Sequence, residues 1–216
     1  MMKIRVECRS LPPSTKKRFL RAAEYLLFVG GTVAIGYCML VYFEARVYES
    51  FEAPRFENPL GTAPAYEFAN RFRIMPQDGS PVSRIEIPRI GVSVLVVEGV
   101  GTRSLTLGVG HVPGTALPGQ IGNIGIAGHR DTFFRNLNYI HGRDTITLIT
   151  ARGAYKYSVE STEIVDPSDV EVLDPSSEPV LTLITCYPFR YVGPAPKRFI
   201  VRARQIGGLE TSRPLP

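Results

Sequence analysis

The sequence predicts a mainly β domain that follows one N-terminal membrane-spanning helix. From residue 81 onward, seven or eight short runs rich in β-branched residues are separated by Gly and Pro, without a long amphipathic helical pattern. This pattern favours a closed β-barrel. Before it, residues 25–43 form an apolar run of nineteen residues without a charge. A helix of this length spans about 28 Å, close to the thickness of the hydrocarbon core of a bilayer.

The charges on either side of the apolar run predict its orientation. Seven Lys or Arg residues precede the run against two Glu residues, whereas the segment that follows it is acidic. By the positive-inside rule, we expect residues 1–22 to be a cytoplasmic tail, residues 23–43 to span the cell membrane once, and the rest to lie outside. A cleaved signal peptide is the alternative, but its apolar region is usually shorter and ends at a small-x-small site.

The net charge of +5 does not indicate a nucleic-acid partner, because of where the charge lies. The basic and acidic residues that precede the apolar run account for all five charges, so the rest of the chain is close to neutral. We therefore expect the basic tail to set the topology and to touch anionic lipid headgroups. The expected partner is the membrane, with no nucleic acid.

The remaining elements follow in chain order. Residues 44–80 are rich in Pro, Glu and Arg, and we expect an extracytoplasmic stalk whose first part, residues 45–53, can extend the anchor helix. The β domain is expected over residues 81–206, and a flexible C-terminal tail over residues 207–216. Residues 151–154 are predicted to form a hairpin turn. Strands are predicted around Ile85 and Ile87 and over residues 92–97, 123–127, 145–150, 155–164, 180–185 and 199–204.

One strand ends at the only cysteine of the outer domain, Cys186. The other two cysteines, Cys8 and Cys38, lie in the basic tail and in the apolar run, so Cys186 has no disulfide partner within its own domain. A lone thiol outside the membrane is open to oxidation. A cysteine nucleophile is one reason to keep it, and a small buried apolar side chain is the other. The strand alone leaves both interpretations open.

A histidine and an arginine lie at two further strand ends. His129 follows the predicted strand 123–127, and Arg198 begins the last strand, twelve residues after Cys186. If the strands that carry Cys186 and Arg198 pair, the short loop between them lets these two residues lie side by side. Arg190 is the alternative arginine, but it lies in a Pro-rich loop.

These residues give the chain a resemblance to the sortases, the membrane-anchored cysteine transpeptidases of bacterial surfaces. The motif TLITC ends at Cys186, AGHRD surrounds His129, and Arg198 lies in KRFIVRA. The segment GHVPGTALPG at residues 110–119 is most similar to the class D branch. The resemblance covers about residues 81–206 and implies an eight-strand closed barrel with short helices.

The resemblance also implies an activity. Cys186 would cleave a C-terminal sorting signal similar to LPxTG through a thioacyl-enzyme, and the acyl group would pass to an amine on a cell-wall peptide or a pilin lysine. His129 would exchange protons with the thiol, and Arg198 would hold the charge that develops on the substrate carbonyl. Thr185 and His111 are expected to help bind or position the substrate.

Other uses of these side chains are less consistent with the sequence. The histidine and cysteine spacings match no short metal-ligand pair, and we expect no metal and no cofactor. Calcium binding remains a minor alternative, through four acidic residues of one loop: Asp166, Asp169, Glu171 and Asp174. His141 is expected in an exposed turn, and Asp131 is expected to pair locally with Arg130 and to take no part in catalysis. Two other functions stay open: a membrane-anchored cysteine peptidase that uses water as acceptor, and a non-catalytic surface binding module.

Overall fold

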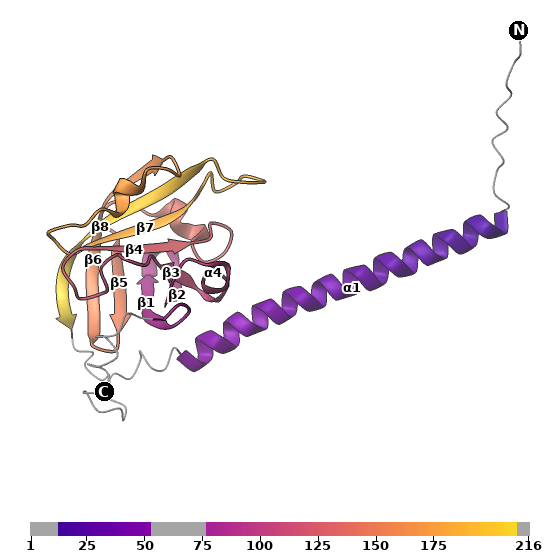
Figure 1. Cartoon of the computed structure of the whole chain (residues 1–216), viewed down its shortest axis with the longest axis horizontal. Helices are drawn as coiled ribbons and strands as arrows, with labels where there is room; N and C mark the ends of the chain where they lie inside the picture. Colours follow the sequence, from indigo (N-terminus) through magenta and orange to yellow (C-terminus); the bar gives the residue numbers. More distant parts are fainter. Residues whose placement is uncertain (1–12, 53–76, 211–216) are drawn as a thin grey trace, which may run out of the picture. The chain divides into compact units, whose positions relative to one another are not determined.

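The computed structural model describes residues 13–52 and 77–210 of the chain (Figure 1). The described residues belong to an N-terminal helical unit and a C-terminal β unit. The expected cytoplasmic tail lies mostly outside the described residues, as does the part of the expected stalk that covers residues 53–76.

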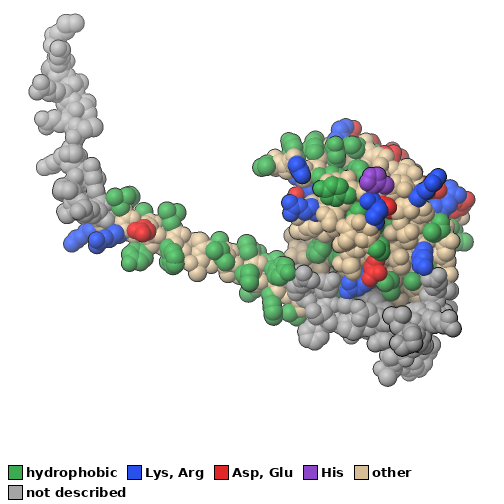
Figure 2. Space-filling model, turned by 180° about the vertical axis from the view of Figure 1, so that it is seen from behind, with side chains coloured by type: hydrophobic (Ala, Val, Ile, Leu, Met, Phe, Trp, Pro, Cys, Tyr) green, Lys and Arg blue, Asp and Glu red, His purple; other side chains and the backbone are tan. Residues whose placement is uncertain are grey.

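The helix α1 covers Pro13–Glu52, and the N-terminal unit comprises its part up to Glu44. A proline suits the first turn of a helix, where its missing N–H has no partner to lose. The stretch Arg18–Glu44 is long and apolar enough to cross a membrane, and hydrophobic side chains are exposed along it, with basic side chains near its start (Figure 2). The helix continues to Glu52, so the predicted extension past residue 43 is confirmed.

The C-terminal unit contains a closed barrel of eight strands (Figure 1), which confirms the predicted fold class. Strands β2 and β3, and strands β4 and β7, pair in parallel, and all the other pairs are antiparallel. Around the barrel the strands follow the order β1, β2, β3, β4, β7, β8, β6, β5. Their bounds are β1 Pro81–Ile87, β2 Val92–Glu98, β3 Val109–His111, β4 Asn123–Gly128, β5 Thr145–Thr150, β6 Gly153–Val165, β7 Val180–Tyr187 and β8 Lys197–Glu210.

Four short helices connect the strands, as the resemblance implied. They are η1 Pro88–Ile90, α4 Thr102–Leu107, η2 Arg135–Tyr139 and η3 Val170–Leu173. The hairpin between β5 and β6 lies where the sequence predicted it, with Thr150 paired to Gly153.

The barrel interior is filled by apolar side chains from all eight strands and from the loop before η2. Strand β4 contributes Ile124 and Ile126, strand β7 contributes Leu181 and Leu183, and Phe134 is fully buried beside them. Closing the sheet removes the exposed strand edges, and the alternating residues of each strand meet in one core. This core fixes the strands on which the candidate site lies.

Two features of the domain differ from the sequence-based expectation. Strand β3 was not predicted, because it has only three residues, includes Gly110, and lies in a Gly- and Pro-rich segment that resembles a loop. Strand β8 runs to Glu210 and pairs with β6, with Lys156 opposite Gly207 and Ala154 opposite Glu210. The expected flexible tail 207–216 therefore begins with four residues of strand, because the long partner strand β6 supplies backbone hydrogen-bonding groups that the local Gly-Gly sequence does not reveal.

Candidate active site

Three neighbouring strands bring His129, Cys186 and Arg198 to one level of the barrel. Strand β7 lies between β4 and β8 (Figure 1). Gly128 pairs with Thr185, so His129 follows β4 at the level of Cys186, and Cys186 itself is paired with Arg198 across β7 and β8. The predicted pairing of Cys186 with Arg198 is confirmed. Cys186 thus lies between His129, which follows β4, and Arg198 on β8.

The turn after β4 places His129 at the surface. The backbone N–H of Phe134 donates to the carbonyl of His129 at 3.1 Å, which folds the chain back over the strand end. Gly128 is needed for this fold, because a Cβ there would lie 2.6 Å from the Phe134 ring and 2.9 Å from Val109. Phe134 is buried while His129 is exposed, so the core anchors the turn and leaves the imidazole accessible.

Thr185 was expected to help bind or position the substrate, and its hydroxyl is directed toward β4. Its side chain is buried, and its hydroxyl donates to the carbonyl oxygen of Gly128 at 2.7 Å. Adjacent residues of a strand point to opposite faces, so Thr185 does not share the face of Cys186. The contact ties β7 to the residue that precedes His129.

Cys186 and Arg198 are both half-buried. Cys186 carries a free thiol. Nη1 of Arg198 donates to the backbone carbonyls of Ala195 and Lys197, at 3.3 and 3.1 Å. Within the described part of the chain no carboxylate pairs with Arg198 and no acceptor binds its Nε or Nη2. Two edges of the guanidinium therefore have donors to offer to a substrate carbonyl.

The loop between β6 and β7, residues 166–179, packs beside the strands that carry the site. The Asn123 side chain holds it by donating to the carbonyls of Val172 and Asp174, at 2.9 and 3.2 Å. Thr182 in turn donates to Oδ1 of Asn123 at 2.7 Å. On the other side of the loop, Lys197 lies 2.8 Å from Asp166. The loop is thus attached to β4, to β7 through Asn123, and to the start of β8.

The same loop holds the acids considered for calcium. Asp166 is paired with Lys197, and Oδ2 of Asp169 accepts from the backbone N–H of Asp166 at 2.9 Å. In residues 13–52 and 77–210, no group of three or more His, Cys, Asp or Glu side chains is arranged to hold a metal ion.

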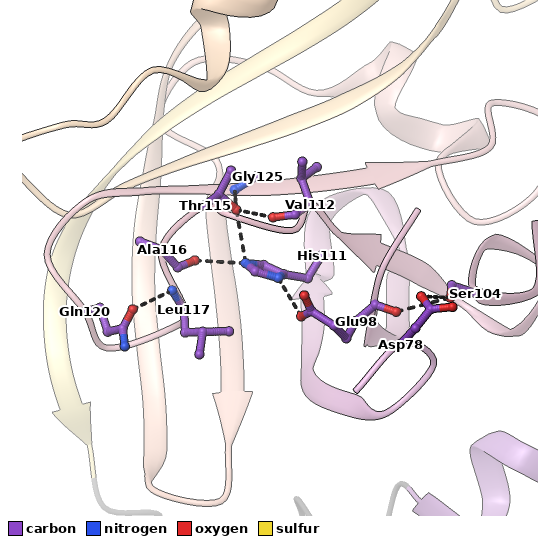
Figure 3. Close-up of polar contacts among 10 residues, drawn as sticks. All are labelled: Asp78, Glu98, Ser104, His111, Val112, Thr115, Ala116, Leu117, Gln120 and Gly125. Carbon is purple, nitrogen blue, oxygen red and sulfur yellow. Dashed lines mark hydrogen bonds and ion pairs between the residues drawn. The ribbon is translucent and has the colours of Figure 1, made fainter. Parts of the chain in front are cut away.

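His111, which was expected to help bind or position the substrate, is buried, and both of its ring nitrogens face protein groups (Figure 3). Its Nδ1 lies 2.7 Å from Oε2 of Glu98, and its Nε2 faces the carbonyl of Ala116 at 3.0 Å and the hydroxyl of Thr115 at 3.1 Å. That hydroxyl donates to Val112, so Nε2 carries a proton and donates. The ring fastens the segment after β3 to β2. Its partner Glu98 lies in β2, thirteen residues earlier in the sequence.

His141 lies at the surface, whereas Arg130 is buried. His141 is exposed in a turn, as predicted, and its backbone N–H donates to Asp144 at 2.7 Å. Arg130 was expected to pair with Asp131, and its Nε does lie 3.5 Å from Oδ1 of that residue. Its terminal nitrogens, however, bind three carbonyls of the loop between β7 and β8. Apart from the adjacency of Arg130 to His129, no feature of the sequence indicated this role.

Comparisons with known proteins agree with this geometry. Residues 85–206 match the family model of the sortase domain. Sortase D of Bacillus subtilis (strain 168) is 36% identical over 138 residues, which cover 63% of this chain and 70% of that protein. A solved Clostridium perfringens sortase D5 transpeptidase has a TM-score of 0.62 at 29% identity, covering 70% of this chain and 92% of its own.

A further solved structure, sortase E1 of Streptomyces coelicolor with a tripeptide in the active site, has a TM-score of 0.54 at 29% identity. The match covers 60% of this chain and 90% of that one. The family match spans more than half of the sequence and includes all three strand ends described above. The chain therefore belongs to the sortase family of cysteine transpeptidases.

Proposed function

We propose that this protein cleaves C-terminal sorting signals similar to LPxTG on surface proteins and joins the new carboxyl end to an amine. The observation that carries the proposal is the register of β4, β7 and β8, which aligns His129, Cys186 and Arg198 on adjacent strands. A nucleophile, a proton carrier and a donor for the carbonyl oxygen are the three groups that acyl transfer requires.

The reaction runs in two acyl transfers. The thiolate of Cys186 attacks the carbonyl carbon of the scissile bond, and Arg198 donates to the oxygen as negative charge develops there. The C–N bond breaks, and the leaving amine takes a proton from the His129 imidazolium, which leaves a thioacyl-enzyme. An acceptor amine then attacks the thioester carbon and gives its proton to His129, and the sulfur departs as thiolate. The acceptor is an amine of a cell-wall peptide or of a pilin lysine.

The proposed location follows from the helix α1. The stretch Arg18–Glu44 is long and apolar enough to span a bilayer, and the charge asymmetry of the sequence around it favours a cytoplasmic N-terminus. We therefore place the protein in the cell membrane with a single pass and the barrel outside. A reporter fused after Pro216 should behave as exported, and the full-length mass should remain with membranes. A soluble form that starts after the apolar run would show that the run is a signal peptide.

The activity is tested with an LPxTG-type peptide and an added amine. The wild-type protein should release the C-terminal fragment and form the peptide–amine product, whereas Cys186→Ala should form neither. His129→Ala should reduce turnover by roughly 10²–10⁴-fold, as expected for a positioned proton carrier, and His141→Ala serves as its exposed control. Release without amine product would favour a peptidase that uses water. An active Cys186→Ala variant would overturn the proposal.

A further inference from the structure

Arg130 occupies an unusual position for an arginine beside a candidate catalytic histidine. It is only 6% exposed, although His129 before it and Asp131 after it are both exposed. Its Nη1 donates to the carbonyl of Pro188 at 2.8 Å, and its Nη2 donates to the carbonyls of Tyr191 and Gly193 at 2.9 and 3.2 Å. The guanidinium also lies 5.8 Å from the centre of the Tyr191 ring.

These acceptors all belong to the loop 188–196, which joins Cys186 on β7 to Arg198 on β8. The loop projects from the barrel (Figure 1) and exposes Val192 almost completely. Two arginines hold its backbone, because Arg198 donates to Ala195 near the end of the loop while Arg130 binds its first two thirds. The loop that Arg130 fastens is therefore the loop against which the guanidinium of Arg198 rests.

The ion pair with Asp131 does not explain why Arg130 is buried. Asp131 has a side chain that is 74% exposed, and its carboxylate is 3.5 Å from Nε. Exposed ion pairs of this kind contribute little to stability. Hydrogen bonds from a charged donor to backbone carbonyls are stronger than neutral ones, and the rigid fork of arginine offers donors on two terminal nitrogens, whereas lysine has a single nitrogen. The loop carbonyls, and not Asp131, are its main partners.

We propose that Arg130 is a positioning residue of this enzyme: it fastens the loop 188–196 to the strand end that carries His129, and so sets the orientation of Arg198. The inference rests on the proposed function for its effect on catalysis, but the fastening of the loop does not. None of the side-chain contacts of Arg130 within the described residues involves Cys186. Arg130 acts through the loop, which it holds at Pro188, Tyr191 and Gly193.

The fastening is tested by hydrogen exchange on the full-length protein in detergent. Arg130→Met keeps the apolar stem and removes all the donors, so exchange of the amides in residues 189–193 should become about tenfold faster or more. Exchange in β1 and β5 should stay unchanged. Arg130→Lys, which keeps the charge without the fork, should lie between Arg130→Met and the wild type. Arg135→Met, at an exposed position of η2, and Asp131→Asn are matched controls and should leave the loop unchanged.

The effect on catalysis is tested by a double-mutant cycle with Arg198→Lys. A small displacement of a catalytic group is costly, so Arg130→Met should lower kcat by about 10- to 100-fold. If Arg130 acts through Arg198, the same change in the Arg198→Lys background should cost less than about 3-fold, because interacting residues are not additive. A general loss of folded protein would lower kcat by the same factor in both backgrounds.

The outcomes separate the inference from the proposed function. Unchanged exchange of the loop in both Arg130→Met and Arg130→Lys overturns the fastening, whatever the activity. Faster exchange with additive kinetic losses overturns the action through Arg198. Faster exchange in a protein whose wild type cleaves no sorting-signal peptide supports the fastening and overturns the proposed function.

Discussion

Replacing His111 by alanine should weaken the fold and leave the chemistry intact. The His111 side chain is 3% exposed and the Glu98 side chain 10% exposed. They lie 2.7 Å apart, and within the described residues this is the one hydrogen bond of the Glu98 carboxylate. Removing one partner of a buried pair leaves the other desolvated and alone, at a cost of roughly 3–5 kcal/mol. The contacts of Nε2 to Ala116 and Thr115 are lost as well.

The expected size of the effect follows from the size of the domain. We take about 3 kcal/mol, the lower end of that range, because the carboxylate is close enough to the surface to recover some hydration. For a domain of this length that corresponds to a fall in Tm of about 10 °C. Far-UV circular dichroism or tyrosine fluorescence can follow the unfolding, since the chain has no tryptophan.

Two further variants sharpen this test. His111→Ala combined with Glu98→Ala should be more stable than His111→Ala alone, because no unpaired carboxylate is left inside. Well below its Tm, His111→Ala should keep kcat and KM within about 3-fold, unlike a change in a group that acts on the substrate. An unchanged Tm with a large rise in KM would refute this reasoning and return His111 to the substrate-binding role that the sequence suggested.

Three other variants test separate parts of the structure. Arg198→Lys should lose about 10²–10³ in kcat with little change in KM, the scale of a lost oxyanion donor; near-wild-type kcat in peptide kinetics would shift attention to Arg190. Tyr157→Phe should stabilise the fold by about 1 kcal/mol, because the buried Tyr157 hydroxyl has no partner within the described residues and an unpaired buried hydroxyl is unfavourable. Burial also raises the pKa of Tyr157. As the pH rises above about 10, the wild type should therefore lose stability more steeply than Tyr157→Phe does. Equal alkaline unfolding curves for the two proteins would contradict this. The hydrogen bond from Arg89 lowers the pKa of Asp144, against the opposing effect of burial and with help from the backbone N–H of His141. The stability that Asp144 adds is therefore present above the ordinary Asp range near pH 4 and is lost below it. In denaturant unfolding, Asp144→Asn should be less stable than the wild type at neutral pH, and its stability should depend less steeply on pH in the acid range. An unchanged acid dependence would exclude this contribution.

The sequence by itself predicted the candidate catalytic groups and determined most of the strands. Cys186, His129 and Arg198 each stand at the end of an alternating or apolar run, and alternation along a strand is a local property that needs no tertiary information. The pairing of Cys186 with Arg198 could be predicted because a short loop joins their strands. The apolar helix was equally plain, since its length and lack of charge are set by residues next to one another.

Only the tertiary structure decided which surfaces these residues face. Strand β4 lies beside β7 although β5 and β6 intervene in the sequence, and only this order brings His129 to the level of Cys186. Thr185, His111 and Arg130 are polar residues whose roles depend on partners in other elements: Gly128, Glu98 and the loop 188–196. A polar side chain near an active site can bind substrate or hold the backbone, and its residue type is the same in both cases. The choice depends on burial and on the acceptors within hydrogen-bonding distance, and both arise only when the barrel closes.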